Sequence, residues 1–398
     1  MRVLIPLHGF IEWNGGLDLI RLLSAILESG EDRNIEIVYA VPEAGPLYRA
    51  LHSLVKTWQR FRSRASPSLS GASRLPAIAM EIIGDRDWNS CGRQGADIAR
   101  LADAIKADVI FPSLIPIKKC GAVRIGYIFD FQHLHLPDLF SRRIIRKRNR
   151  QFAKIAASSD GIIVNSDFVR RDVITCLNFD QDKIFKLPFM PFKNQKVTID
   201  PEGALDKYKI SRPYLIVCNH FWVHKDHETA LRAFSALILI PEFSELSLVL
   251  TGDPVDHRNP SHYAQLLALS KSLGISIRTH FLGLIPKADQ LSLLNGSRLL
   301  VQPTRYEGGP GGGAVYEAMG NGIPAVVSDI SINREIGHDA IVFFAAGQAE
   351  DLKSKIILAL SQKSHFDLVR TPDEAMKDAS DSLIRFMAEI CSTRDASK

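Results

Sequence analysis

The stretch QPTRYEGGPGGGAVYEAMGNGIPAVVSDISINREI, from Gln302 to Ile336, is the most informative part of this chain. It places five glycines between Glu307 and Ala314, directly before a segment with a helical pattern. A glycine-rich loop that runs into a helix lets backbone N–H groups approach an anion, and the helix dipole adds partial positive charge there. The stretch therefore predicts a phosphate-binding helix start. A flexible loop before an ordinary helix is the alternative.

Glu317 lies one turn inside that predicted helix. A carboxylate at this place can accept hydrogen bonds from sugar or ribose hydroxyls. The alternative is an ordinary acidic side chain that the helix dipole stabilises near a helix start. We therefore treat Glu317 as a candidate binding residue.

A second informative stretch, VCNHFWVHKDH, runs from Val217 to His227. It joins a predicted strand to a predicted helix, and ligands bind at such carboxyl ends of strands in open α/β sheets. Lys225, near the helix start, can act as a point charge for a phosphate. The stretch also contains three histidines, His220, His224 and His227. No acidic or cysteine ligand completes a known spacing, so we expect no metal here.

Two loops in the N-terminal half follow predicted strands. The loop GFIEWNGGL, from Gly9 to Leu17, contains the pair Gly15 and Gly16, which would let the backbone pass close to a ligand. The loop DFQHLH, from Asp130 to His135, contains His133. For this histidine a structural role and a ligand contact both remain open.

Short β-rich apolar runs alternate with longer amphipathic segments, a pattern that builds parallel sheets covered on both faces. The alternation stops between Lys186 and Arg212, where three prolines and little periodicity indicate a linker. At roughly 150 residues per domain, 398 residues suit two or three domains. We predict two α/β domains, 1–190 and 191–372, and a terminal helix within 373–398 that returns to the N-terminal domain.

Composition excludes several classes of protein. The apolar share of 46% and charged share of 23% are typical of a folded globular chain, not a disordered one. The net charge of +5 is too small to indicate a nucleic-acid binder. The longest apolar-leaning uncharged stretch, Ala233 to Pro241, is much shorter than the roughly 20 residues of a spanning helix. Five scattered cysteines suit a reducing compartment. We expect a cytoplasmic protein.

The basic excess is concentrated in SRRIIRKRNRQ, from Ser141 to Gln151, where six of the nine residues 142–150 are basic. On a helix, part of this run would form a cationic face able to attract anionic lipid headgroups. The alternative is a solvated basic helix that packs through Ile144 and Ile145. An anionic membrane surface is therefore a candidate partner, which would place the protein at the inner face of the membrane.

The motifs together resemble the retaining glycosyltransferases of family four. The signature-like positions are Glu307, the glycine run, Glu317-Ala318-Met319, Gly322, Pro324 and Glu335-Ile336. Lys225-Asp226 followed by Ala230 and Phe234 resembles the phosphate-binding lysine helix of that family. The likeness covers most of the C-terminal half and is patchier before residue 120. It implies the GT-B architecture, in which two Rossmann-like domains with parallel sheets face each other across a cleft.

The resemblance also implies roles for particular residues. Glu317 would bind the ribose of a nucleotide sugar, Lys225 would neutralise the diphosphate, and Glu307 would hold the transferred sugar. His133 would touch the donor sugar from the N-terminal domain, which carries the acceptor. Lys225, Glu307 and His133 are thus the candidate catalytic residues. The remaining candidate nucleotide-sugar-binding residues are Gly15, Gly16, His220, Gly308, Gly311, Gly312 and Gly313.

Two positions depart from the family pattern. Nine residues separate Glu307 from Glu317, whereas the family usually has seven between its two glutamates. His220 stands where the family usually has an arginine, five positions before Lys225.

The implied activity is transfer of a hexose, with retention, from a nucleotide sugar to a saccharide or lipid-linked acceptor, in cell-surface polysaccharide or lipopolysaccharide biosynthesis. Such transfer needs no metal or other cofactor and relies on charge stabilisation and positioning. One alternative is a GT-B nucleotide-sugar epimerase. The other is a catalytically silent protein that binds a sugar nucleotide. No nucleic-acid partner is expected.

Overall fold

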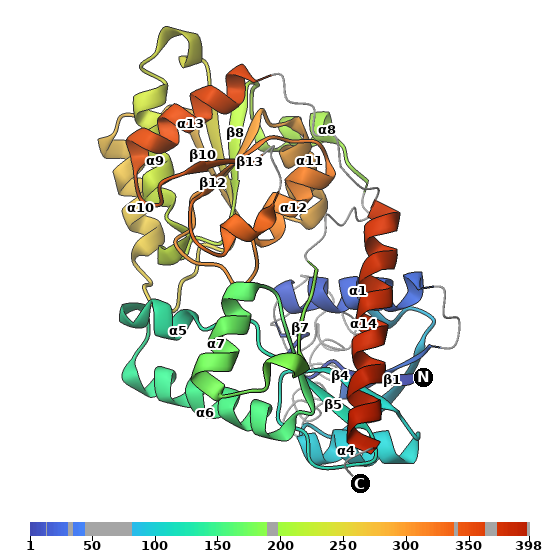
Figure 1. Ribbon diagram of the computed structural model, residues 1–398. Helices are drawn as coiled ribbons and strands as arrows, with labels where there is room; N and C mark the ends of the chain where they lie inside the picture. The colour runs from blue at the N-terminus through green and yellow to red at the C-terminus, as the bar shows by residue number, and fades with distance from the viewer. Residues whose placement is uncertain are drawn as a thin grey trace, which may run out of the picture.

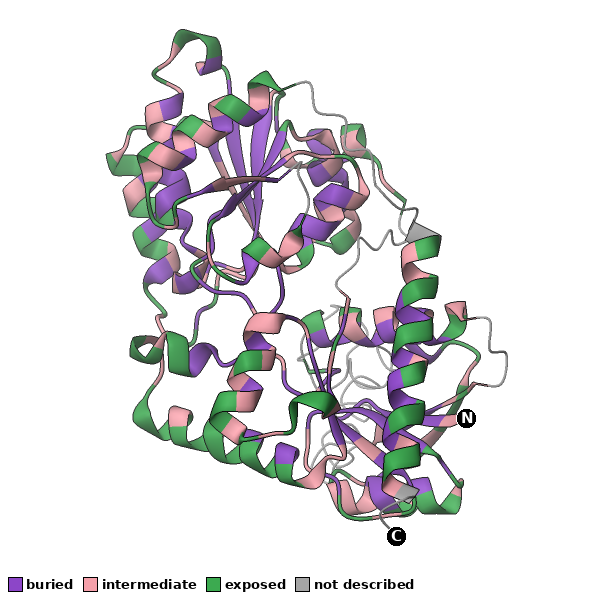
Figure 2. Ribbon diagram, viewed as in Figure 1, coloured by how far each residue is buried: buried purple, intermediate pink, exposed green. Residues whose placement is uncertain are grey.

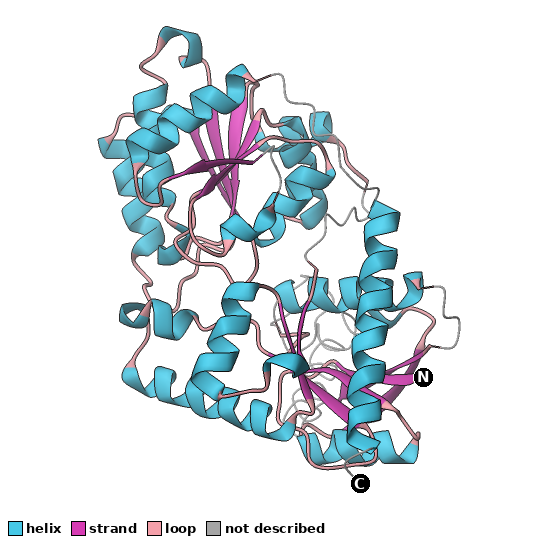
Figure 3. Cartoon of the chain, in the orientation of Figure 1, coloured by secondary structure: helices cyan, strands magenta, loops and turns pink. Residues whose placement is uncertain are grey.

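Two parallel β-sheets organise the chain, each with helices packed against it (Figure 1). The computed structural model describes residues 1–12, 14–30, 35–43, 82–188, 198–337, 341–362 and 372–395. The two α/β domains predicted from the alternation of strands and helices are confirmed (Figure 3). The predicted boundary at residues 190 and 191 lies outside the described residues.

The first domain contains a seven-stranded sheet of order β3-β2-β1-β4-β5-β6-β7 among the described residues. Its strands are β1 (Arg2–Pro6), β2 (Glu36–Pro42), β3 (Asp87–Cys91), β4 (Val109–Ser113), β5 (Val123–Tyr127), β6 (Gly161–Val164) and β7 (Ile184–Lys186). Its helices are α1 (Asn14–Ser29), α4 (Gly95–Ala104), α5 (Gln132–His135), α6 (Arg142–Ser158) and α7 (Asp167–Leu177).

The second domain contains a six-stranded sheet of order β10-β9-β8-β11-β12-β13 within the described ranges. Its strands are β8 (Tyr214–Cys218), β9 (Ser247–Thr251), β10 (Thr279–Gly283), β11 (Leu299–Gln302), β12 (Ala325–Ser328) and β13 (Ile341–Phe344). Its helices are α8 (Pro201–Tyr208), α9 (His227–Leu237), α10 (His262–Ser272), α11 (Lys287–Gly296), α12 (Gly312–Gly320) and α13 (Ala349–Ser361). Short 3₁₀ helices include η4 (Val223–Lys225) and η7 (Asn333–Ile336).

Strand β8 shows why the strands consist of continuous apolar runs. Leu215 and Val217 enter the core on one face of the sheet, and Tyr214, Ile216 and Cys218 enter the core on the other face. Because helices cover both faces, successive side chains of β8 are all buried, as are those of the neighbouring strands β9, β11 and β12 (Figure 2).

Helix α14 (Pro372–Asp395) lies against α1 of the first domain (Figure 1). Its buried residues Leu383, Met387 and Ile390 belong to the hydrophobic core of that domain. The ring of Phe386 also packs on Phe185, with 5.2 Å between centroids. The chain therefore crosses to the second domain and returns. No helix within the described ranges has the length and apolar character that crossing a membrane requires.

All strand pairs in both sheets are parallel, so the carboxyl ends of each sheet meet at one edge. In each sheet the strand order reverses at the first strand of the domain, between β1 and β4 and between β8 and β11. Ligands of open α/β sheets bind outside the carboxyl ends at such reversals. The topology therefore directs attention to the loops after β1, β4, β8 and β11.

Candidate functional site

The two domains touch through loops at the carboxyl ends of their strands. The hydroxyl of Tyr306, after β11, accepts a hydrogen bond of 3.1 Å from the backbone N–H of Phe131, after β5. The Tyr306 ring also stacks on His135, with 5.6 Å between centroids. These contacts hold the carboxyl ends of the strands of the two sheets next to each other.

Glu335 makes a second contact between the domains. Its carboxylate accepts hydrogen bonds of 2.7 and 2.8 Å from the backbone N–H groups of Asp167 and Phe168, in the first turn of α7. A carboxylate at a helix N-terminus satisfies donors that have no partner within the helix and interacts well with the dipole. The signature-like Glu335 therefore fixes the position of the domains.

The glycine run forms the start of α12 in a conformation that suits glycine. Gly311 and Gly312 have φ angles of +67° and +65°. A Cβ on Gly312 would lie 3.2 Å from Cδ of Glu307, and a Cβ on Gly311 would lie 2.7 Å from Cβ of Val315. The N-cap residue is Gly311 itself, which has no side chain to cap the helix. The N–H of Gly312 donates to the carbonyl of Gly309 at 3.3 Å, so the site that the sequence predicts for an anion would use the N–H groups that follow it in the first turn of α12.

Gly313 differs from its two neighbours because a Cβ there would have no heavy atom within 4 Å. The space beside this residue is open, at the first turn of α12. The first turn of α12 is therefore open beside Gly313, whereas side chains lie close to Gly311 and Gly312.

Lys225 and Glu307 form an ion pair beside this helix start. Nζ of Lys225 donates to Oε1 of Glu307 at 2.5 Å, and the two side chains are only 12% and 10% exposed. Nε2 of Gln302 donates to the same carboxylate at 3.1 Å and to the carbonyl of Gly311 at 2.9 Å. Asn219 in turn donates to Oε1 of Gln302 at 2.7 Å. The network joins the carboxyl ends of β8 and β11 to the glycine run.

Asn333 supports the same helix start from η7. Its Oδ1 accepts from the backbone N–H of Gly311 at 2.9 Å, and its Nδ2 donates to the carbonyl of Ser328 at 2.9 Å. Neither Asn333 nor Gln302 was selected from the sequence. Their position at or after a strand's carboxyl end is the signal that could have indicated them.

Glu317 pairs with Lys287 at the start of α11. Burial raises the pKa of Glu317, Lys287 acts in the opposite direction, and the negative charge of Asp18 raises it further. Asp18 belongs to α1 of the first domain, so Glu317 faces that helix across the domain boundary. Lys287 and Asp18 were not selected from the sequence, because they come close to Glu317 only in the folded chain.

Gly15 and Gly16 lie in the first turn of α1, two to three residues before Asp18. Gly15 is exposed and Gly16 is buried. The start of α1 therefore belongs to the surface of the first domain that faces Glu317.

The histidines of the second stretch are held neutral. Nδ1 of His220 accepts a hydrogen bond of 2.9 Å from the backbone N–H of Asp253. Burial lowers the pKa of His220, and Lys225 lowers it further. Burial likewise lowers the pKa of His224 to about 2 and that of His227 to about 3. These residues add no positive charge at neutral pH. In the described part of the chain no group of three His, Cys, Asp or Glu side chains is placed to hold a metal ion.

His133 is fully buried, at 0% exposed. Its Nε2 shares a hydrogen bond of 2.6 Å with Oδ1 of Asn149 in α6, and its ring stacks on Phe131 and meets the edge of Phe152. Hydrogen bonds bring Lys225, Glu307 and the glycine run together, and His133 is not part of that network. It instead fixes α5 against α6, whereas His135 reaches the domain contact.

Two Rossmann-like domains joined in this way define the GT-B fold, which solved structures share over the length of the chain. HepE from Anabaena, in complex with UDP and glucose, has 13% identity and a TM-score of 0.59, with 100% of both chains covered. Sucrose-phosphate synthase from Thermosynechococcus elongatus has 13% identity and a TM-score of 0.61, covering 99% of this chain and 98% of that one. The lipopolysaccharide outer core galactosyltransferase WaaB has 13% identity and a TM-score of 0.59, covering 98% and 99%.

Residues 206–377 match the sequence model of the family described as Glycosyl transferases group 1. A search of curated proteins gives no match. The matched segment contains Lys225, the glycine run and both glutamates selected from the sequence. The match over residues 206–377 and the shared GT-B fold together support a glycosyltransferase, which confirms the predicted fold and enzyme class.

Proposed function

We propose that this enzyme transfers a hexose, with retention, from a nucleotide sugar to a saccharide or lipid-linked acceptor in the synthesis of a cell-surface polysaccharide or lipopolysaccharide. The glycine-rich start of α12, open beside Gly313 and next to the Lys225–Glu307 pair, carries the proposal. Two similar folds support it. HepE was solved with UDP and glucose, and WaaB is a galactosyltransferase of the lipopolysaccharide outer core.

The donor would bind with its diphosphate at the first turn of α12. The space beside Gly313 gives the phosphates access to backbone N–H groups, and the helix dipole favours their charge. Glu317 lies one turn further along and can accept hydrogen bonds from the ribose. This order along one helix matches the order of phosphate and ribose in a nucleotide.

Catalysis would consist mainly of stabilising the leaving diphosphate. Lys225 lies next to the helix start, and Glu307 holds its ammonium group in place. As the bond between sugar and diphosphate breaks, negative charge grows on the leaving oxygen, which can take the proton of the acceptor hydroxyl on the same face. Preorganised positive charge near that oxygen lowers the barrier. We propose that the reaction needs no metal, because Lys225 and α12 supply this charge.

A thermal-shift screen against UDP, GDP, ADP and dTDP identifies the nucleotide, since a ligand at 100 times its Kd stabilises by about 2.7 kcal/mol. Release of that nucleoside diphosphate from its sugar is then measured with and without saccharide acceptors. Release that requires an acceptor and persists in EDTA supports the proposal. Acceptor-independent release with a changed sugar would support an epimerase, and binding without any turnover would support a silent binding protein.

We further propose a cytoplasmic enzyme that contacts an anionic membrane surface through residues 142–150. All of α6 from Arg142 to Lys147 is exposed except Ile145, which is half-buried. Co-sedimentation with anionic and neutral vesicles, at low and at high salt, tests this location. Binding that ignores both lipid charge and salt would refute it.

A further inference from the structure

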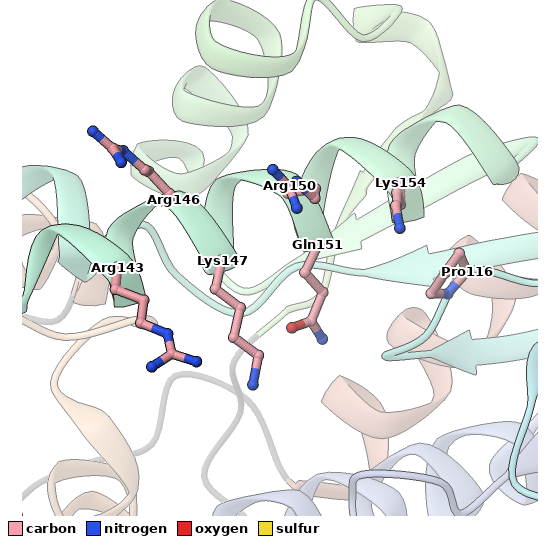
Figure 4. Close-up of a pocket in the computed structure, with 7 residues that line it drawn as sticks. All are labelled: Pro116, Arg143, Arg146, Lys147, Arg150, Gln151 and Lys154. Atoms are coloured by element: carbon pink, nitrogen blue, oxygen red, sulfur yellow. The ribbon is translucent and has the colours of Figure 1, made fainter.

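Helix α6 borders a hollow of about 570 Å³ whose lining is strongly cationic. The lining residues are Pro116, Arg143, Arg146, Lys147, Arg150, Gln151 and Lys154. Figure 4 shows Arg143, Lys147 and Gln151 extending from α6 in a common direction. Five of the seven lining residues are basic, and Arg146 extends from the other side of α6 than Arg143 and Lys147.

These five cations form no ion pair with the residues that the structure describes. Arg148 on the same helix shows the contrast, because it pairs with Asp130 at 2.7 Å and lies over the ring of Phe129. Arg148 does not line the hollow. The basic run therefore contains one arginine with a structural partner, Arg148, and several cations that have no ion-pair partner among the described residues.

The hollow lies at the carboxyl edge of the first sheet. Pro116 belongs to the loop that follows β4, and Nε2 of Gln151 donates to the carbonyl of Leu114 in the same loop at 3.4 Å. Because the sheet is parallel, this edge also carries the start of α1, where Asp18 acts on Glu317 of the second domain. The hollow and the start of α1 therefore belong to the same edge of the first sheet.

We infer that this hollow binds a phosphate or diphosphate group of the acceptor. The term acceptor rests on the proposed function, whereas the anion chemistry rests on the hollow itself. Guanidinium groups recognise phosphate oxygens by paired hydrogen bonds, and ammonium groups add point charge. The volume is within the range of small-molecule sites, about 300–1,000 Å³. The phosphate belongs either to a soluble phosphosaccharide or to a lipid-linked one.

Two adjacent arginines provide a matched test, since Arg143 lines the hollow and Arg142 does not, although both are exposed. Inorganic pyrophosphate is titrated calorimetrically into the full-length wild-type protein, R143Q and R142Q. We expect R143Q to weaken pyrophosphate binding about tenfold and R142Q by less than about twofold. Any pyrophosphate bound at α12 is common to all three proteins. Equal weakening in both variants, or none in either, would overturn the inference.

Vesicles distinguish the sources of the phosphate. Wild type, R143Q and R142Q are co-sedimented with phosphatidylglycerol and phosphatidylcholine vesicles, with and without pyrophosphate. If R143Q weakens the binding of pyrophosphate but keeps the binding of vesicles, the phosphate belongs to a soluble acceptor. If R143Q selectively loses binding to phosphatidylglycerol vesicles, and pyrophosphate displaces the wild type from these vesicles, the phosphate is borne by a lipid. Both assays omit the donor, so they remain decisive even if sugar transfer is not found.

Discussion

The carboxyl edges of the two sheets hold their polar side chains in different ways. In the second domain Lys225, Glu307 and Gln302 are nearly buried and bonded to one another. In the first domain the cations of α6, such as Arg143 and Lys147, are exposed and have no ion-pair partner among the described residues. We call these the donor edge, at the second sheet, and the acceptor edge, at the first, after the ligands proposed for them. The comparison indicates that the side chains of the donor edge are held by one another, whereas the cations of the acceptor edge would be neutralised by the proposed ligand.

The difference has an energetic consequence. Removing one member of a buried, bonded network leaves its partners unsatisfied, which is costly. Removing one exposed cation from a like-charged group disturbs little. Variants at the two edges should therefore separate effects on stability from effects on binding.

The largest effect is expected at Lys225. K225A should lower kcat by about 10²–10³-fold, because the leaving diphosphate loses its nearest cation. The unpaired Glu307 should also lower the free energy of unfolding by about 3–5 kcal/mol. Urea unfolding and steady-state kinetics measure the two effects. The double variant K225M/E307Q should recover stability but not turnover. Recovery of both would show that Lys225 has only a structural role.

The next effect is expected at Glu317. E317A removes charge-assisted hydrogen bonds to the ribose of about 1.5–3 kcal/mol, so donor affinity should fall about tenfold to a hundredfold. Burial raises the pKa of Glu317, so its carboxylate is lost at a higher pH than usual. Wild-type affinity should therefore decrease as the pH falls through that pKa, and E317Q should lack this step. Calorimetry across pH with identical profiles in both proteins would exclude the ribose contact.

A smaller effect concerns acid stability at the donor edge. Burial lowers the pKa of His227 to about 3, against about 6.5 in the unfolded chain. The unfolded state binds the extra proton, so this residue costs stability as the pH falls below about 6.5, by about 2 kcal/mol at pH 5. H227F should therefore show a smaller fall in Tm between pH 7 and pH 5 than wild type. A fall of the same size would mean that His227 does not contribute.

The glycines at the start of α12 offer a paired test, in which the expected change in stability is similar to or smaller than that at His227. G312A should destabilise by about 1–2 kcal/mol, because its φ of +65° is unfavourable for alanine. G313A should leave stability unchanged, since its Cβ meets nothing within 4 Å, yet it should weaken donor binding by occupying the open space. Thermal unfolding and donor titration separate the two. Unchanged donor affinity in G313A would place the diphosphate elsewhere.

The smallest effect is expected at the acceptor edge. R143Q/K147Q should change the free energy of unfolding by less than about 0.5 kcal/mol, because both side chains are exposed and unpaired among the described residues. Urea denaturation measures this directly. A loss of several kcal/mol would show that these cations have structural partners, and the contrast between the two edges would disappear.

Local patterns in the sequence were enough to predict the two domains and the helix start. Continuous apolar runs such as Tyr214 to Cys218 predict buried parallel strands, and they are buried on both faces. The glycine run predicts accessible backbone, and Gly311 and Gly312 do adopt left-handed angles. These features depend on neighbours in the sequence, which is why they could be predicted.

Features that depend on distant residues could not be predicted in the same way. The partner of Lys225 is 82 residues away, and Asp18 and Lys287 reach Glu317 from different elements. Sequence analysis also left open whether His133 contacts a ligand, since the aromatic cluster that buries it forms only when α5 packs on α6.

Hydrogen–deuterium exchange with the nucleoside diphosphate selected by thermal shift tests the central claim most directly, because it locates the donor. Peptides that cover 308–317 and 142–154 report on the two edges in one experiment. The account predicts slower exchange at the start of α12 on binding and no change along α6. Protection along α6, with none at the start of α12, would contradict it.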